Sequence, residues 1–92
     1  MLKKYIIERE VPGIGNNTPE GFCAIARTSN GALQKIGPDI QWLESFVVDE
    51  KTYCVYLASD EENIRQHAKL SGFPATRIRE VKAIIDPSTE LA

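Results

Sequence analysis

Two glycine–proline stops constrain the fold of this chain more than any other feature of its sequence. The first is Gly37-Pro38 and the second is Gly72-Phe73-Pro74. Glycine supplies the left-handed conformation that ends many helices, and a following proline prevents the helix from continuing. A helix is therefore expected before each stop, and a strand is expected after it.

The residues before each stop have the apolar spacing and the caps of helices. The first helix is expected over 19–36, with Thr18 as its cap and Pro19 at its first position. Its buried face is expected to hold Phe22, Ile25, Ala26, Ser29, Leu33 and Ile36. The second helix is expected up to residue 71, behind a capping box with Ser59 as the cap and Glu62 at the third position.

Strand-like stretches occupy the rest of the chain. They are predicted over 3–9, 40–48, 51–58 and 76–85, and Asp49-Glu50 forms the tight turn of a hairpin. The order β-α-β-β-α-β predicts an α+β, ferredoxin-like sandwich with an antiparallel sheet and both helices on one face. The 92 residues make one domain, 1–92, with 88–92 as a loosely held tail.

Alternation assigns the strand residues to two faces of the sheet, provided that no bulge shifts the register. The set expected under the helices is nearly all apolar: Tyr5, Ile7, Leu43, Ser45, Val47, Tyr53, Val55, Leu57, Val81, Ala83 and Ile85. The set expected on the other face mixes apolar and charged residues: Ile6, Glu8, Trp42, Glu44, Phe46, Val48, Cys54, Tyr56, Ile78, Glu80, Lys82 and Ile84.

The second set is too apolar to face water. An apolar sheet surface on the order of several hundred Å² marks an interaction site. Two such sheets packed face to face would make a dimeric α/β barrel, so a homodimer is expected. The side chains assigned to this dimer face or to a ligand pocket are Trp42, Phe46, Cys54, Tyr56 and Tyr53.

Charge and hydropathy exclude two classes of partner. The net charge of −2 and the lack of a Lys/Arg-rich stripe argue against nucleic acid. No apolar run approaches the ~20 residues that span a bilayer, so no membrane partner is expected. Glu8, Arg9 and Glu10 interrupt the only start that looks like a signal peptide, which favours a cytoplasmic location.

Several short runs resemble a bacterial family of small ferredoxin-like dimeric domains labelled nickel-binding. These runs are Tyr5-Ile6-Ile7-Glu8-Arg9 with Pro12-Gly13, Gln41-Trp42-Leu43-Glu44-Ser45-Phe46-Val47, Lys51-Thr52-Tyr53-Cys54-Val55-Tyr56, His67-Ala68, Gly72-Phe73-Pro74 and Ile85-Asp86-Pro87. The similarity extends over almost the whole chain. It implies a ferredoxin-like dimer with nickel as a ligand, and it implies no particular set of liganding residues.

Three residues are the candidate metal ligands. His67 is the single histidine, and imidazole suits nickel, copper and zinc. Glu8 and Glu44 are expected on the sheet face away from the helices, where carboxylates can bind a divalent ion. The alternative for His67 is a core histidine hydrogen-bonded to Tyr53 or Ser45. Because His67 and Glu44 fall on opposite faces, one site that uses both needs a contribution from a second subunit.

Three functions remain open at this point. The first is a small homodimeric binding protein for a divalent metal, nickel above all. The second is a cofactor-free enzyme of the dimeric α/β-barrel type, monooxygenase- or isomerase-like, that acts on a small aromatic substrate with His67 or Glu44 as the base. The third is a protein whose apolar sheet face serves assembly alone.

Overall fold

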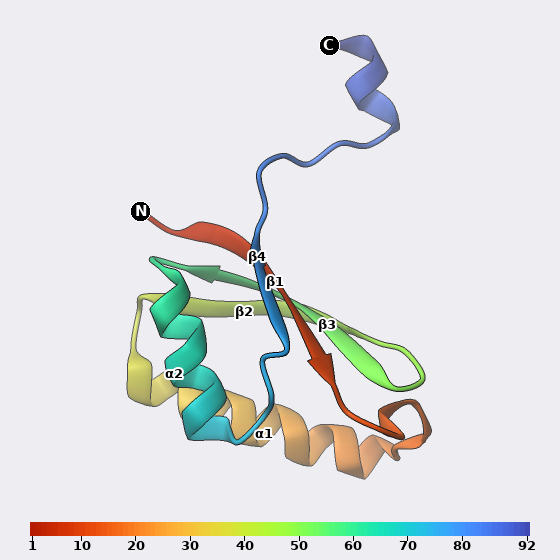
Figure 1. The fold of residues 1–92 in the computed structure, drawn as a ribbon, viewed down its shortest axis with the longest axis vertical. Coiled ribbons are helices and arrows are strands. Elements are labelled where there is room, and N and C mark those ends of the chain that lie inside the picture. Colours follow the sequence, from red (N-terminus) through yellow and green to blue (C-terminus); the bar gives the residue numbers. More distant parts are fainter.

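The computed structural model describes residues 1–92 as a four-stranded antiparallel sheet with both helices on one side (Figure 1). The elements in chain order are β1 (Lys3–Glu10), a 3₁₀ turn η1 (Ile14–Asn16), α1 (Pro19–Ile36), β2 (Ile40–Val47), β3 (Lys51–Ala58), α2 (Glu61–Ser71), β4 (Arg77–Glu80) and a second 3₁₀ turn η2 (Pro87–Leu91). The strand order is β2-β3-β1-β4. This α+β arrangement is compatible with the predicted ferredoxin-like fold.

Local capping explains where the helices begin and end. The Thr18 hydroxyl accepts a hydrogen bond from the Gly21 N–H at 3.0 Å, as the sequence predicts. The cap of α2 is Asp60 and not Ser59, because the Asp60 carboxylate accepts the Asn63 N–H at 3.1 Å. Gly72 takes the left-handed conformation that ends α2, with φ of 80°.

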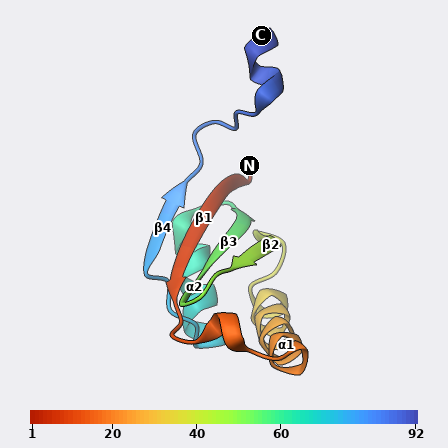
Figure 2. The ribbon, with the colours of Figure 1, turned by 90° about the vertical axis from the view of Figure 1, so that its right-hand side faces the viewer.

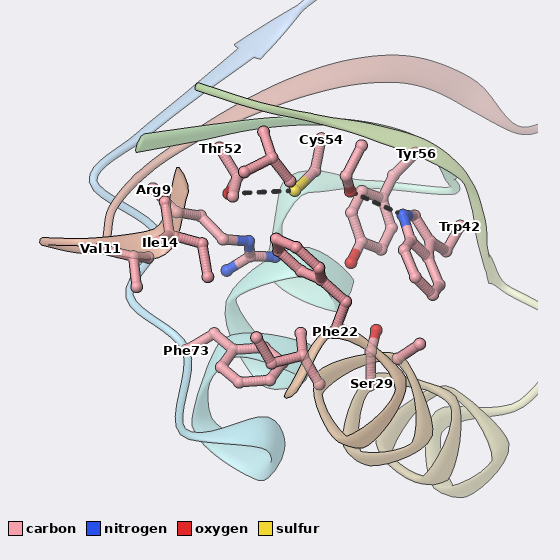
Figure 3. A pocket seen from close by; sticks show the side chains of 14 residues that line it. Arg9, Val11, Ile14, Phe22, Ser29, Trp42, Thr52, Cys54, Tyr56 and Phe73 are labelled. Carbon is pink, nitrogen blue, oxygen red and sulfur yellow. Dashed lines mark hydrogen bonds between the residues drawn. The ribbon is translucent and has the colours of Figure 1, made fainter. Parts of the chain in front are cut away.

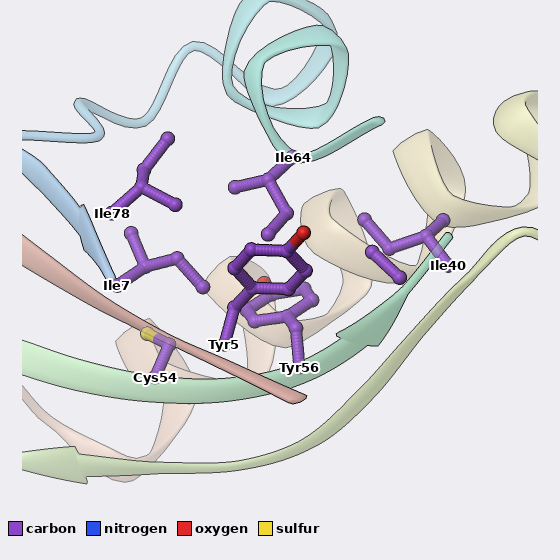
Figure 4. Close-up of a cluster of buried hydrophobic side chains, with 8 residues drawn as sticks. Tyr5, Ile7, Ile40, Cys54, Tyr56, Ile64 and Ile78 are labelled. Carbon is purple, nitrogen blue, oxygen red and sulfur yellow. The ribbon is translucent and has the colours of Figure 1, made fainter. Parts of the chain in front are cut away.

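The hydrophobic core lies between the two helices and the sheet. It gathers Tyr5, Ile7, Ile40, Cys54, Tyr56, Ala58, Ile64 and Ile78, as Figure 4 shows from close by. Ile7 and Ile64 are fully buried, so β1 and α2 each place an isoleucine at its centre. Burial of such a side chain stabilises the fold by roughly 1.5–3 kcal/mol.

The pairing of β1 with both of its neighbours decides which residues face the helices. Ile7 lies opposite Cys54 on β3 and opposite Ile78 on β4, and residues directly opposite each other point to the same face. Tyr5 and Ile7 lie under the helices as predicted. Ile78 was predicted on the other face, and this prediction is wrong.

The opposite surface of the sheet is covered by neither helix. Its side chains, which we call the open face, are Ile6, Glu8, Glu44, Phe46, Tyr53, Val55 and Leu57. Phe46 and Ile6 are 54% and 41% exposed. This face is therefore an apolar surface that also carries the carboxylates of Glu8 and Glu44, with Lys51 and Arg77 close to Glu8.

The fourth strand is shorter than the predicted 76–85. It spans Arg77–Glu80, and a last ladder bond runs from the Val81 N–H to the Lys4 carbonyl at 2.8 Å. From there the chain leaves the sheet and projects away from the domain, ending in η2 (Figures 1 and 2). The alternating pattern in 76–85 predicts a longer strand. However, β1 begins at Lys3, so it has no further residues that could pair with the chain after Val81.

No helix in this fold has the length and apolar character that a bilayer span requires.

The loop after β1 packs tightly on the β2–β3 hairpin. The Val11 N–H donates to the Glu50 carbonyl at 2.9 Å, and the Gly15 N–H donates to the Asp49 carbonyl at 3.0 Å. A Cβ at position 15 would lie 2.9 Å from both the Asp49 Cα and the Val48 carbonyl oxygen. Glycine is thus required here by close backbone approach, and the contact holds Val11 and Ile14 over the sheet.

Replacing this glycine should loosen the loop. Gly15→Ala forces backbone atoms apart, so we expect it to lower the free energy of unfolding by roughly 1–3 kcal/mol. The matched control is Gly31→Ala, an exposed position in α1 where an added Cβ meets nothing within 4 Å. That change should raise stability by about 0.5–1 kcal/mol. Urea unfolding of both variants measures the difference, and equal effects would contradict the contact.

Candidate functional site

A cavity of about 330 Å³ lies between α1 and the sheet (Figure 3). It is lined by residues of β1, η1, α1, β2, β3 and two loops: Arg9, Val11, Ile14, Phe22, Ile25, Ala26, Ser29, Trp42, Ser45, Val47, Thr52, Cys54, Tyr56 and Phe73. Most of these side chains are apolar. The volume is at the lower end of the range of about 300–1,000 Å³ that small-molecule sites occupy.

Arg9 brings the one formal charge into this cavity. Its position near the end of β1 has the same parity as Tyr5 and Ile7, so its side chain turns inward, and it is only 3% exposed. The Arg9 Nη1 donates to the Pro74 carbonyl at 2.8 Å. Its Nη2 is buried and has no hydrogen-bond partner. A buried guanidinium with a free donor is costly unless something else satisfies it.

The smaller polar groups that line the cavity are largely bonded to one another. The Trp42 Nε1–H donates to the Ser45 hydroxyl at 2.9 Å. The Thr52 hydroxyl lies 3.5 Å from the Cys54 thiol. Figure 3 shows both contacts on the sheet side of the cavity. These residues therefore present mainly their apolar parts.

The side chain of Tyr56 lies close to the Arg9 guanidinium. The Arg9 guanidinium carbon lies 5.9 Å from the centre of the Tyr56 ring. Burial raises the pKa of the Tyr56 hydroxyl, although the Arg9 charge and the Ser29 hydroxyl act to lower it. The hydroxyl is therefore neutral near pH 7 and is available as a hydrogen-bond donor.

His67 lies behind the cavity and does not line it. Its side chain is fully buried, its Nε2 is 3.1 Å from the Ser29 hydroxyl, and its Nδ1 has no partner. The ring packs against Tyr56 with 5.4 Å between centroids. Burial and the nearby Arg9 charge lower the pKa of His67 from 6.5 to about 4. The imidazole is therefore neutral near pH 7, and its partner is Ser29, not Tyr53 or Ser45 as the sequence suggested.

The structure corrects the predicted faces of the aromatic and thiol side chains. Trp42, Cys54 and Tyr56 were predicted on the face away from the helices, but they line the cavity under α1. Tyr53 was predicted under the helices, but it lies on the open face beside Phe46. The five residues assigned to a ligand pocket or dimer face thus divide between the two sides of the sheet.

Two features of the β2–β3 hairpin account for this error. A register shift between Trp42 and Glu44 turns the start of β2 over relative to its end. On β3, apolar residues occupy both parities, so hydrophobicity alone does not orient the strand. The two-residue turn supplies the missing signal, because the Val48–Lys51 pair it creates places Cys54 opposite Ser45.

The candidate metal ligands are not brought together within one chain. His67 is enclosed on the helix side, whereas Glu8 and Glu44 lie on the open face, on strands separated by β3. The Glu8 carboxylate is 3.3 Å from the Lys51 ammonium and 3.7 Å from the Arg77 guanidinium. The chain contains no group of three or more His, Cys, Asp or Glu side chains placed to hold a metal ion. The residues that one chain assembles therefore do not fit a nickel site.

Sequence reasoning also missed Arg9 as a functional residue. Its parity with Tyr5 and Ile7 was the available signal, because a charged residue at a core-facing position of a strand requires a partner. The predicted buried face of α1 did include Phe22 and Ser29, and both line the cavity.

Comparison with known proteins gives one family and one fold. A family model described as "Nickel responsive protein SCO4226-like" matches residues 5–81. The chain is similar in fold to the crystal structure of SCO4226 from Streptomyces coelicolor A3(2), with a TM-score of 0.75 over 89% of this chain and 99% of that chain. The two sequences are 12% identical, so this likeness establishes the fold alone. No match was found among curated proteins.

The buried imidazole should make stability depend on pH. Because the pKa of His67 is about 4 in the folded chain and 6.5 in the unfolded one, the unfolded state binds more protons between these values. The stability that the neutral His67 contributes is present above about pH 6.5 and is lost as the pH falls toward 4. We expect about 2 kcal/mol less stability at about pH 5 than at about pH 7.5.

The variant His67→Gln isolates this effect, because His67 is the single histidine. Urea unfolding across the pH range should show a shallower slope for His67→Gln than for the wild-type protein, since glutamine does not titrate. Parallel slopes for the two proteins would contradict a buried, neutral histidine.

Proposed function

Because this chain belongs to the SCO4226-like family of nickel responsive proteins, we propose that it is a homodimeric binding protein for divalent metal ions, with nickel as the first candidate. The observation that carries the proposal is the open face. It combines exposed apolar side chains with the carboxylates of Glu8 and Glu44, and neither helix of its own chain covers it.

A second copy of the chain is the occupant that best suits this face. Ile6 and Phe46 are exposed there beside Tyr53, Val55 and Leu57. The face also carries both signs of charge, with Glu8 close to Lys51 and Arg77. In a two-fold arrangement each patch meets its own copy, so acidic and basic groups of one chain can face their opposites on the other. Two sheets packed in this way form the dimeric α/β barrel.

The C-terminal segment adds apolar surface that its own domain does not cover. Ile84, Ile85 and Leu91 are 68%, 78% and 86% exposed. The segment projects beyond the sheet in Figures 1 and 2, where it has nothing of its own chain to pack against. In a dimer it would lie against the partner and enlarge the interface toward the roughly 800 Å² per subunit of a standard complex.

Dimerisation would also supply the metal donors that one chain lacks. Glu8 and Glu44 are on strands about 10 Å apart, with β3 between them. Two copies meeting at the open face would bring four carboxylates to one interface. Carboxylate oxygens bind divalent ions, and a given site generally binds nickel more tightly than manganese. His67 is left outside this assignment because the Arg9 charge near it repels cations.

The dimer is tested by placing a charge on the open face. Phe46→Glu would bury an unpaired carboxylate at the interface, so we expect at least a hundredfold weaker association, about 2.7 kcal/mol. Leu70→Glu on α2 is the matched control, because Leu70 is 45% exposed on the other side of the molecule and should leave association unchanged. Sedimentation equilibrium measures both. A wild-type protein that stays monomeric at tens of micromolar would refute the dimer.

The metal ligands are tested by titrating nickel, zinc, copper and manganese into the metal-free protein by calorimetry. Glu44→Gln removes a charged donor and should weaken nickel binding at least tenfold, about 1.4 kcal/mol. Glu62→Gln, at an exposed position of α2, is the control. His67→Ala should leave nickel affinity unchanged in protein that remains folded. If His67→Ala weakens nickel binding and Glu44→Gln does not, the ligand assignment is wrong.

A further inference from the structure

We propose that the cavity between α1 and the sheet binds a small organic monocarboxylic acid, whose carboxylate pairs with Arg9 and whose apolar body fills the remaining space. This site is on the helix side of the sheet, opposite the open face. It depends on neither dimerisation nor metal binding.

The charge of Arg9 is the first step of the argument. A guanidinium stays protonated at every physiological pH, so burial cannot neutralise it. Arg9 takes part in none of the ion pairs of the chain. Those pairs join the carboxylates of glutamates to Lys51, Arg65, Arg77 and Lys82. Its Nη2 is buried beside the cavity without a partner. An incoming carboxylate would supply both the missing acceptor and the missing counter-charge.

The other side chains limit the rest of the ligand. The polar groups of Trp42, Ser45, Thr52 and Cys54 are already bonded within the wall. A second charged group on the ligand would therefore find no partner on that side. Figure 3 shows the Arg9 guanidinium extending inward toward Phe22, with the Tyr56 hydroxyl directed into the same space.

The shape of the space favours a flat, apolar ligand body. Aromatic walls are supplied by Phe22 on α1, Trp42 on β2 and Phe73 in the loop after α2. About 330 Å³ accommodates a compact molecule with one or two rings. The ligand class is thus an aryl or short alkyl carboxylate. The cavity is poorly suited to a metal cation, because Cys54 is the single metal-binding side chain in its wall and Arg9 is positive.

Trp42 provides a direct readout, since it is the only tryptophan and it lines the cavity. The probe is phenylacetate, and phenylacetamide serves as its neutral partner of the same shape. Both probes are titrated into the wild-type protein, and binding is followed by tryptophan fluorescence and calorimetry. Phenylacetate should bind at least tenfold more tightly than phenylacetamide. Adding a divalent metal should not be required.

Three variants locate the site. Arg9→Gln should lower phenylacetate affinity at least tenfold and remove the preference over phenylacetamide. Arg27→Gln, an exposed arginine on α1, is the matched control and should bind like the wild-type protein. Ala26→Leu fills the cavity while Arg9 stays in place, so it should abolish binding of both probes. Circular dichroism confirms that each variant is folded.

Two results would overturn the proposal. One is equal binding of phenylacetate and phenylacetamide, or no binding of either, by the wild-type protein. The other is unchanged phenylacetate affinity in folded Arg9→Gln. If Arg9→Gln does not fold, the two wild-type titrations and Ala26→Leu decide, and phenylacetate binding that survives Ala26→Leu counts against the cavity.

Discussion

The register of the central strand β1 against β3 and β4 is the constraint on which the rest of this structure depends. It places Tyr5 beside Tyr56, and Ile7 between Cys54 and Ile78, all under the helices. The same alternation carries Arg9 inward. A slip of one residue would turn Glu8 and Glu10 into the core and expose both Tyr5 and Ile7. The core and the cavity are thus two results of a single pairing.

The sheet separates two surfaces that differ in how their charges are placed. The helix side encloses the Arg9 guanidinium without a counter-charge, whereas on the open face the Glu8 carboxylate is paired with Lys51 and Arg77. Adjacent residues of β1 contribute to both, because Glu8 points outward and Arg9 points inward. A displacement of this strand would act on both surfaces at once.

Sequence patterns predicted the elements of this fold well and the site poorly, for specific reasons. Caps and glycine–proline stops are local signals, so the order of the elements and the C-terminal end of each helix follow from them. The residues of β3 do not show by themselves which side faces the helices, since the two faces of this strand differ little in hydrophobicity. The shift between Trp42 and Glu44 has no sequence signature, and it reverses the side chains before it. The partner of His67 comes from α1, on a segment 38 residues away, which no spacing rule reveals.

The burial of His67 also affects the net charge of the protein in mild acid. Histidine is the only side chain whose ordinary titration falls between pH 5 and 7, and this chain keeps its single copy neutral in the interior. Between pH 5 and 7 the folded molecule therefore gains no positive charge from histidine, whereas the unfolded chain does. Near pH 5 the two forms should differ by about one unit of net charge. A separation based on charge, such as native electrophoresis, can therefore distinguish the folded molecule from its unfolded chain in mild acid.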